Sequence, residues 1–493
     1  MSSDAPPSTA VSAAPSRKEP PPEEPHDVRR RSYVILSFWL IVLLLGLPIW
    51  WHTTAIYRAS LPLDEMGEWA DWKACRPVFP LRIAVQASTM QDGEGQNLVK
   101  LTQHALDDLN DFSWHHLRLD LIPPVPVEPH AAEADVALTI RLIPGEPMEA
   151  TLHPHLPILD IKYPPNSPPT PSSSSSPLAT FIARELRSKF AEERAIISAL
   201  LSKELRPARS MQYSPTYHLT FSLFTSGSTP NTWEIENAIS EYMRPVLDIL
   251  RPIHNFTIDT QVQLYATPGV QSQSLEKEDL ASFINAAEWP LSPSIAGAPT
   301  INFVVYIGNQ TIGTSSKSWM IPQWGSVYLL DSQENPVGVD ELKQPLLTFT
   351  SHLLSLLGTP ESGSLPLKLS TLSRVRSADL LLRASSTLGS LARLSLALPS
   401  ISIPSSVADG VSKTMKELEL ACQNLGNVQG LEHARIAEQE AEKAFFEKSM
   451  VGQLYFPDEH KIAVYLPLLG PVGVPLIIGL INELKLWRKA RKG

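Results

Sequence analysis

Cysteine is scarce in this chain, and the sequence motifs that carry common enzyme chemistry are missing. Only two cysteines occur among the 493 residues, so only two positions could supply a cysteine nucleophile. No H-E-x-x-H, G-x-S-x-G, G-x-x-x-x-G-K-[ST], G-x-G-x-x-G or C-x-x-C pattern is present. These absences remove the common catalytic frames, and we expect no catalytic residue, no cofactor and no bound metal.

The polar residues that remain as candidates for chemistry lack suitable neighbours. His115 and His116 are adjacent, and His153 and His155 flank a proline, but no carboxylate or cysteine stands nearby at metal-ligating spacing. We therefore expect exposed loop histidines at both places. The acid pair at 107–108 falls in a helical pattern, which predicts a solvated helix face rather than a glycosidase pair.

Positive charge is also in deficit. Lysine and arginine total 41 against 51 aspartates and glutamates, which gives a net charge of −10. The tails at 1–31 and 482–493 carry 0 and +4, so the residues between them carry −14. This balance disfavours nucleic acid or anionic lipid headgroups as partners of the central part.

Two uncharged apolar segments stand near the ends of the chain. Tyr33–Trp51 and Ile462–Ile481 are each long enough to cross a hydrocarbon core of about 30 Å as a helix. Three arginines at 29–31 precede the first segment, and a cluster of lysines and arginines follows the second. The positive-inside bias therefore predicts a two-span membrane protein with both termini in the cytoplasm and the bulk on the far side.

A cleaved signal peptide and a lipid-anchor signal are the alternatives for these segments. A cleaved signal peptide has a shorter apolar run and an A-x-A-like site, whereas this run ends in the bulky residues at 48–51. A C-terminal signal for a glycosylphosphatidylinositol (GPI) anchor finishes in its apolar tail, whereas this chain continues into cations. We therefore favour two retained membrane helices.

Composition divides the chain into six parts. The fold class that these parts predict is an α/β or α+β luminal domain with a C-terminal helical unit, flanked by two transmembrane helices. A Pro- and Ser-rich stretch at 164–177 predicts a flexible loop. The parts are a disordered cytoplasmic tail at 1–32, a transmembrane helix at 33–51, a luminal α/β region at 52–372, a luminal helical unit at 373–461, a transmembrane helix at 462–481 and a basic cytoplasmic tail at 482–493.

Hydrophobic periodicity predicts individual elements within these parts. The predicted strands are 81–88, 135–143, 158–163, 217–225, 260–266, 301–307 and 326–330. The predicted helices are 96–110, 178–205, 232–250, 373–398, 407–425 and 431–449.

The second apolar segment contains three prolines. Pro467, Pro471 and Pro475 are four residues apart, so they share one stripe of a helix, and each removes a backbone hydrogen bond. In lipid the freed carbonyls need partners, which neighbouring helices supply. The stripe predicts contact with partner helices, and a tolerated kink in a simple anchor is the alternative.

Cys75 and Cys422 stand near the two ends of the central part. An oxidising lumen permits a disulfide between them, provided that their Cα atoms approach closely. Two buried thiols are the alternative, and Cys422 lies in a helical pattern where a packed thiol is ordinary.

Two sequons and one aromatic stretch complete the candidate sites. Asn255 and Asn309 each begin an N-x-T sequon, and both are predicted to lie where glycosylation occurs. Trp319 and Trp324 flank a Pro-Gln turn that leads into a predicted strand. These indoles are candidates for partner contact, with core packing as the alternative.

Three sequence segments, together with the order of the predicted regions along the chain, resemble the PIG-S family. They are WMIPQWGSVY at 319–328, STLGSLARL at 386–394, and AFF at 444–446 followed by LYFPDEHKIAVYLP at 454–467. PIG-S is a subunit of the GPI transamidase of the endoplasmic reticulum, which cleaves a precursor near its C-terminus and joins it to a GPI lipid. The resemblance implies a non-catalytic scaffold subunit with a large luminal body in that membrane.

The resemblance also implies partners. They are the cysteine protease-like PIG-K, PIG-T, a GPAA-type subunit and PIG-U, and contact with the GPI lipid is a further candidate. Two alternatives from other classes are open: a luminal membrane-anchored enzyme acting on glycolipid or glycan, and a free-standing luminal receptor or chaperone.

Overall fold

The computed structural model describes residues 24–491 except 55–56, 124–135, 166–169, 171, 203–209, 286, 292–296, 314–315, 400 and 451–457. Contacts divide the chain into two compact units. One unit holds the terminal helices with residues 398–404. The other, Ser60–Ala397 with Ser405–Phe446, holds both large sheets and most of the helices.

The first sheet has the order β2-β1-β3-β5-β4, in which β4 alone is antiparallel to its neighbour. Its core packs leucine and isoleucine side chains from the strands and two helices into one cluster. The strands are β1 (Phe79–Gln86), β2 (His115–Ile122), β3 (Val136–Pro144), β4 (Glu149–Leu152) and β5 (Ile158–Tyr163), and the helices are α4 (Asp92–Leu109) and α5 (Pro177–Lys189).

The second sheet has the order β11-β12-β9-β6-β7, with only β11 and β12 antiparallel. Its central strands β6 and β9 are almost continuously buried, as expected of parallel strands covered on both faces. The strands are β6 (Thr216–Thr225), β7 (Asn255–Gln263), β9 (Thr300–Ile307), β11 (Ser318–Ile321) and β12 (Gly325–Leu329), while β8 (Ser274–Leu275) and β10 (Thr311–Ile312) form a separate pair.

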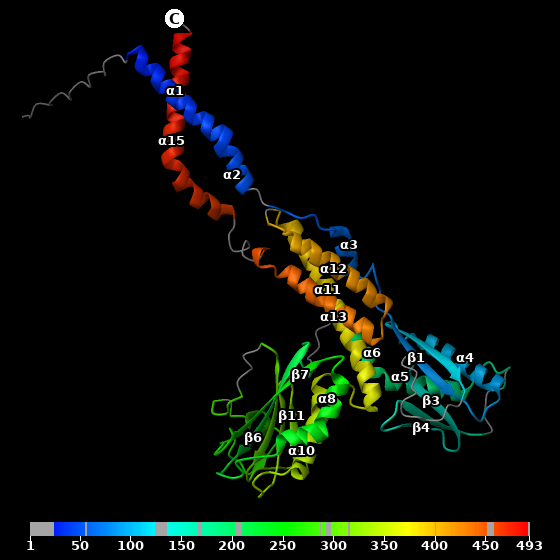
Figure 1. Cartoon of the computed structure of the whole chain (residues 1–493). Helices are drawn as coiled ribbons and strands as arrows, with labels where there is room; N and C mark the ends of the chain where they lie inside the picture. Colours follow the sequence, from blue (N-terminus) through cyan, green and yellow to red (C-terminus); the bar gives the residue numbers. More distant parts are fainter. Residues whose placement is uncertain are drawn as a thin grey trace, which may run out of the picture. The chain divides into compact units, whose positions relative to one another are not determined.

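Helices pack against one side of the second sheet (Figure 1). A helical run along β7 changes between α and π geometry, and a long helix packs beside β12. These helices are α7 (Ile235–Ala238), η2 (Ile239–Met243), α8 (Arg244–Leu250), α9 (Asp279–Ser282) and α10 (Val339–Leu356).

The helical part is built around α11 (Leu365–Ala397), which packs against α13 (Val428–Phe445), α3 (Leu63–Ala70) and α6 (Ala191–Leu201) (Figure 1). Helix α12 (Ser405–Gln423) packs mainly on α13. Close approach depends on glycine, because a Cβ added at Gly389 would lie 2.5 Å from the Cβ of Ala70. The predicted helices at 373–398, 407–425 and 431–449 are confirmed, although α11 begins eight residues earlier than predicted.

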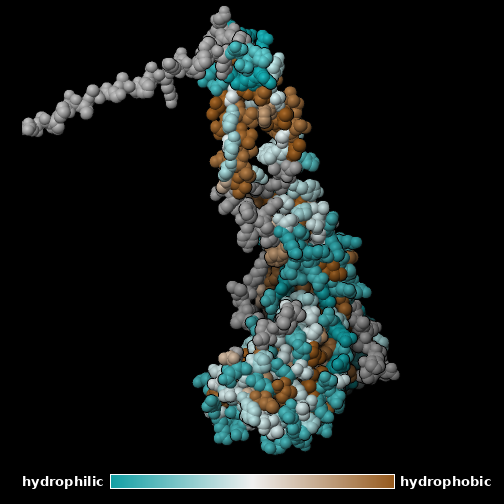
Figure 2. Space-filling model, turned by 60° about the vertical axis from the view of Figure 1, so that its left-hand side comes forward, coloured by the Kyte–Doolittle hydropathy of each residue, from teal (hydrophilic) through white to brown (hydrophobic). Residues whose placement is uncertain are grey.

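The other unit contains the two apolar helical segments. The first comprises α1 (Pro25–Ile41), η1 (Val42–Gly46) and α2 (Leu47–Thr54), and the second is α15 (Asp458–Ala490). Figure 2 shows hydrophobic side chains gathered over these helices, and none of the apolar stretch of either helix is buried inside the protein. Both helices are long and apolar enough to cross a membrane.

The N-terminal tail differs in part from its prediction, and the loop at 164–177 is described only in part. The tail at 1–32 was expected to be disordered, but its described part is helical from Pro25, because helix α1 extends past the apolar stretch. Residues 1–23 lie outside the described residues. In the loop at 164–177, Asn97 of α4 donates hydrogen bonds to the carbonyls of Thr170 and Ser173, which attaches these two residues to α4. Residues 166–169 and 171 lie outside the described residues.

Candidate functional site

A serine and a histidine lie within hydrogen-bond distance in the second sheet. Ser326 Oγ of β12 is 2.6 Å from His352 Nδ1 of α10, and it also donates to the carbonyl of Trp319. Ser326 is fully buried, so no substrate reaches its hydroxyl in this fold. Burial also lowers the pKa of His352, which favours the neutral ring. The pair links β12 to α10 and has a structural role.

His115 corrects the prediction of an exposed loop histidine. It is buried in strand β2, and its Nε2 lies 3.1 Å from Glu193 Oε1 of α6. Its neighbour His116 is exposed, as strand alternation requires. His153 and His155 belong to a loop and their rings contact each other. Asp107 and Asp108 are exposed on α4, so the solvated face is confirmed.

Glu193 is the centre of a buried ionic network that joins α6 to α11. Arg374 donates from Nε and its terminal nitrogen to the two carboxylate oxygens at 2.6 and 2.8 Å, and Thr371 Oγ1 donates at 2.7 Å. Burial raises the pKa of Glu193, but Arg374 and His115 outweigh burial and bring the pKa down to about 2. A charged and fully paired carboxylate of this kind fixes one packing of the first sheet on the helices.

Cys75 and Cys422 form a disulfide with a Cα–Cα distance of 6.6 Å. The bond attaches the segment after α3 to the C-terminal end of α12, across 347 residues of sequence. It therefore closes nearly the whole central part of the chain into one loop.

The two sequons lie on the second sheet region and both asparagines are exposed. Asn255 is the first residue of β7, and Asn309 lies in the turn after β9. Thr257, the hydroxyl residue of the first sequon, is bonded to His218 Nδ1 at 2.7 Å.

Trp319 lies in the core, which favours the packing alternative for this residue. Its indole is 8% exposed and meets Phe283 edge-on at 5.2 Å, and its Nε1 donates to the carbonyl of Leu280. Trp324 lies in the turn between β11 and β12 and is partly buried against the same cluster. The stretch is therefore bound into the second sheet, and Trp319 in particular is unavailable for partner contact in this fold.

The two apolar helices contact each other along one face of α15. Ser32 Oγ donates to Glu483 Oε2 at 2.7 Å, and Trp39 Nε1 lies 3.4 Å from the carbonyl of Leu476. A Cβ added at Gly479 would meet Ile35 at 3.3 Å. These contacts hold the helices together without the three prolines.

Pro467, Pro471 and Pro475 lie inside α15, which remains one helix despite them. Proline cannot donate a backbone hydrogen bond, so the carbonyl four residues before each one loses its intrahelical donor. A neighbouring helix that donates hydrogen bonds along this stripe would therefore satisfy these carbonyls.

The described residues contain no group of three or more histidines, cysteines or acids placed to hold a metal ion. The fold and these sites define a class of protein: a mixed α/β body with one disulfide and a long apolar helix towards each end of the chain, which fits a membrane protein.

Comparison with known proteins identifies the family within this class. The family model for the phosphatidylinositol-glycan biosynthesis class S protein, PIG-S, matches residues 37–490. The chain therefore belongs to this family. It is 28% identical to the GPI transamidase component PIG-S homolog of Schizosaccharomyces pombe, over 94% of this chain and 85% of that protein. It is 25% identical to the human GPI-anchor transamidase component PIGS, over 94% of this chain and 98% of that protein.

Proposed function

We propose that this chain is a structural, non-catalytic subunit of a GPI transamidase complex in the endoplasmic reticulum membrane. One observation carries the proposal: the similarity to proteins named as transamidase components extends over almost the entire chain, including both apolar helices. The same architecture is therefore expected to serve the same kind of assembly.

The topology that we propose has both termini in the cytoplasm and the α/β body in the lumen, as the basic flanks predict. Two membrane helices confine the body to a plane and fix its orientation, which raises its effective concentration for other subunits. The proposed partners are PIG-K, PIG-T, a GPAA-type subunit and PIG-U. The stripe at Pro467, Pro471 and Pro475 is proposed to face partner helices or the GPI lipid.

The surroundings of the few side-chain pairs that resemble catalytic ones also support a scaffold function. Ser326 is buried and bonds to the partly buried His352, and His115 and Glu193 are both buried, so these pairs have roles in packing. Catalysis is accordingly assigned to a partner, and the alternative of a luminal enzyme acting on glycolipid or glycan is disfavoured.

Copurification from mild detergent tests the proposal. The affinity-tagged chain is expected to recover a cysteine protease-like subunit, and deletion of the chain is expected to leave GPI precursors unprocessed. Recovery of the chain alone, together with normal precursor processing in the deletion strain, would contradict the scaffold function. Turnover of a glycolipid by the purified chain would favour the enzyme.

Protease treatment of sealed microsomes tests the topology separately. The central part is expected to be protected and the two tails to be digested. Digestion of the central part with sparing of the tails would reverse the proposed orientation.

A further inference from the structure

Strand β7 is an edge strand of the second sheet, and half of its backbone N–H and C=O groups point away from its neighbour β6. It pairs with β6 without a register shift along all 9 residues. The Asn255 N–H donates to the carbonyl of Pro215, on the β6 side. Backbone groups alternate between the two sides of a strand. The residues whose N–H and C=O point outward are therefore Phe256, Ile258, Thr260 and Val262.

Within the described part of the chain, no strand pairs with the outer side of β7. The other sheet edges are protected or short. At the edge strand β2, Gln103 of α4 donates to the carbonyl of Leu117 and accepts from the Leu119 N–H, so its side chain covers the edge. The edge strands β4 and β11 have only 4 residues each. Proteins commonly protect long edges with lysine, proline or a cover, and the sequence of β7, NFTIDTQVQ, has neither lysine nor proline.

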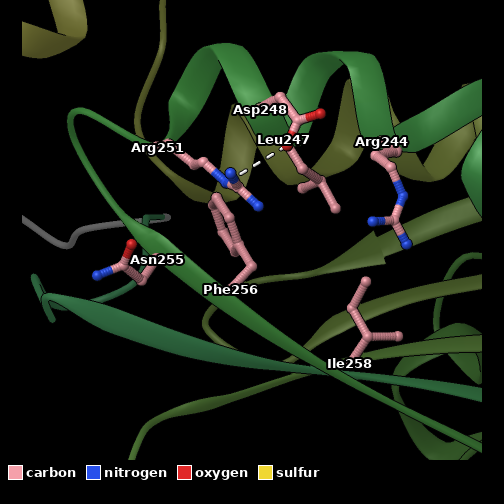
Figure 3. Close-up of a pocket in the computed structure, with 7 residues that line it drawn as sticks. All are labelled: Arg244, Leu247, Asp248, Arg251, Asn255, Phe256 and Ile258. Atoms are coloured by element: carbon pink, nitrogen blue, oxygen red, sulfur yellow. Dashed lines mark ion pairs between the residues drawn. The ribbon is translucent and has the colours of Figure 1, made fainter.

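A groove follows β7 on the side of the helices α7 and α8. Figure 3 shows Phe256 and Ile258 pointing from β7 toward α8, where Leu247 and Arg244 face them. The hollow at this place has a volume of about 340 Å³. A second hollow of about 380 Å³ lies further along β7, beside Thr260 and Val262, and α7 forms its other side. Two hollows with mixed polar and apolar linings thus lie along β7, the strand whose edge is open.

The ends of the groove carry opposite charges. Arg244 and Arg251 line the hollow beside Phe256 and Ile258, where Arg251 also pairs with Asp248 at 3.3 Å (Figure 3). Glu234 and Glu236 line the other end. This polarity favours a bound segment with an acidic group at the first end and a basic group at the second.

The geometry points to strand addition at this edge: β7 takes an extended segment of a partner protein as a further strand of the sheet. Main-chain hydrogen bonds to Phe256, Ile258, Thr260 and Val262 supply affinity, and alternate apolar side chains of the segment enter the groove beside α7 and α8. The inference rests on the proposed function in that the partner is expected to be another subunit of the same complex.

A matched pair of variants at one position tests the inference. Thr260→Pro removes an outward N–H without touching the β6 ladder, because proline is tolerated at the open side of an edge strand. Thr260→Ala keeps that N–H and is the control. In copurification from mild detergent, we expect Thr260→Pro to recover about tenfold less partner than the wild type, and Thr260→Ala to recover a similar amount. Equal recovery by all three chains would overturn the inference, provided that the urea unfolding midpoints of both variants match the wild type.

Photocrosslinking tests it independently of chain stability. Benzoylphenylalanine replaces Val262 in the full chain, and the control replaces Leu347 of α10, which is exposed to a similar extent. We expect a cross-link at Val262 alone, mapped by mass spectrometry to a partner segment with apolar residues at alternate positions. A cross-link to a second copy of this chain, to a helical segment, or equally at both positions would overturn strand addition.

The two proposals fail in different ways. If the wild-type chain recovers no transamidase subunit, the proposed function fails, while the mapped cross-link at Val262 still decides the inference. If the subunits copurify normally with Thr260→Pro and no segment cross-links at Val262, the function stands and strand addition fails.

Discussion

Arg31 of α1 and Glu483 of α15 form an ion pair, with 3.2 Å between Nε and Oε1. They are separated by 452 residues in the sequence, yet both belong to the ends of the apolar helices that carry the basic flanks. Glu483 is the single acid in the basic C-terminal tail, and its side chain is only 19% exposed. Its position accounts for a carboxylate among so many cations, because it pairs the last helix with the first.

Glu483→Ala is expected to loosen this helix pair, because it removes the ion pair and the hydrogen bond from Ser32. The loss is about 1 kcal/mol, as is usual for a partly exposed pair. Spin labels on Tyr33 and Leu484, measured by double electron–electron resonance in lipid nanodiscs, should give a narrow distance distribution in the wild type and a broad one in the variant. Lys485→Ala is the control, and an equal broadening by both variants would contradict the assignment.

Removal of the Cys75–Cys422 disulfide is expected to destabilise the central part by about 3 to 5 kcal/mol, because the bond closes a very long loop. Cys75→Ser, Cys422→Ser and the double variant should lower the free energy of unfolding equally, since each removes the same bond. Urea unfolding followed by tryptophan fluorescence measures this. Single variants that differ by more than about 1 kcal/mol would indicate that one cysteine acts through packing instead.

The sequence predicted the elements whose pattern is local. Strands at 158–163 and 301–307 are confirmed because runs of β-branched and large apolar residues mark buried strands. Helix α10 was missed because Pro345 stands in its interior and resembles a break, although the structure buries it within the helix. Strand β2 was missed because its two histidines suggested a loop, while its alternation of buried and exposed residues carried the correct signal.

Pairings between distant residues could not be predicted in the same way. Periodicity shows which face of an element is apolar, but not which element covers it, so the bond from Arg374 to Glu193 across 181 residues was missed. The open edge of β7 was missed as well, because an edge position depends on strand order rather than on the composition of the strand. The predicted strand at 260–266 overlaps only the second half of β7.

Glu193→Gln is expected to destabilise the fold by about 3 to 5 kcal/mol, because it leaves the Arg374 guanidinium buried with a neutral partner. The adjacent Glu192→Gln is the control, since Glu192 is exposed and a change there should cost less than about 1 kcal/mol. The pKa of Glu193 is lowered, so its contribution is present above the ordinary value of 4.5 and is lost as the pH falls towards about 2. The difference between wild type and Glu193→Gln in urea should therefore shrink below about pH 4, and a constant difference would contradict the network.

Glu438 of α13 is expected to make the fold less stable in alkaline than in acidic solution. Burial raises its pKa to about 7, and the neighbouring Glu442 adds to this effect. A carboxyl whose folded pKa exceeds its ordinary value of 4.5 contributes stability in full below that value and loses it as the pH rises through about 7. Glu438→Gln mimics the protonated acid, so it should exceed the wild type by about 1 to 3 kcal/mol at pH 8 and by less at pH 5. Urea unfolding of the full chain at both pH values measures the difference, with the exposed Glu432→Gln on the same helix as control; a gain at pH 8 that persists unchanged at pH 5 would show that the carboxyl is not titrating in the fold.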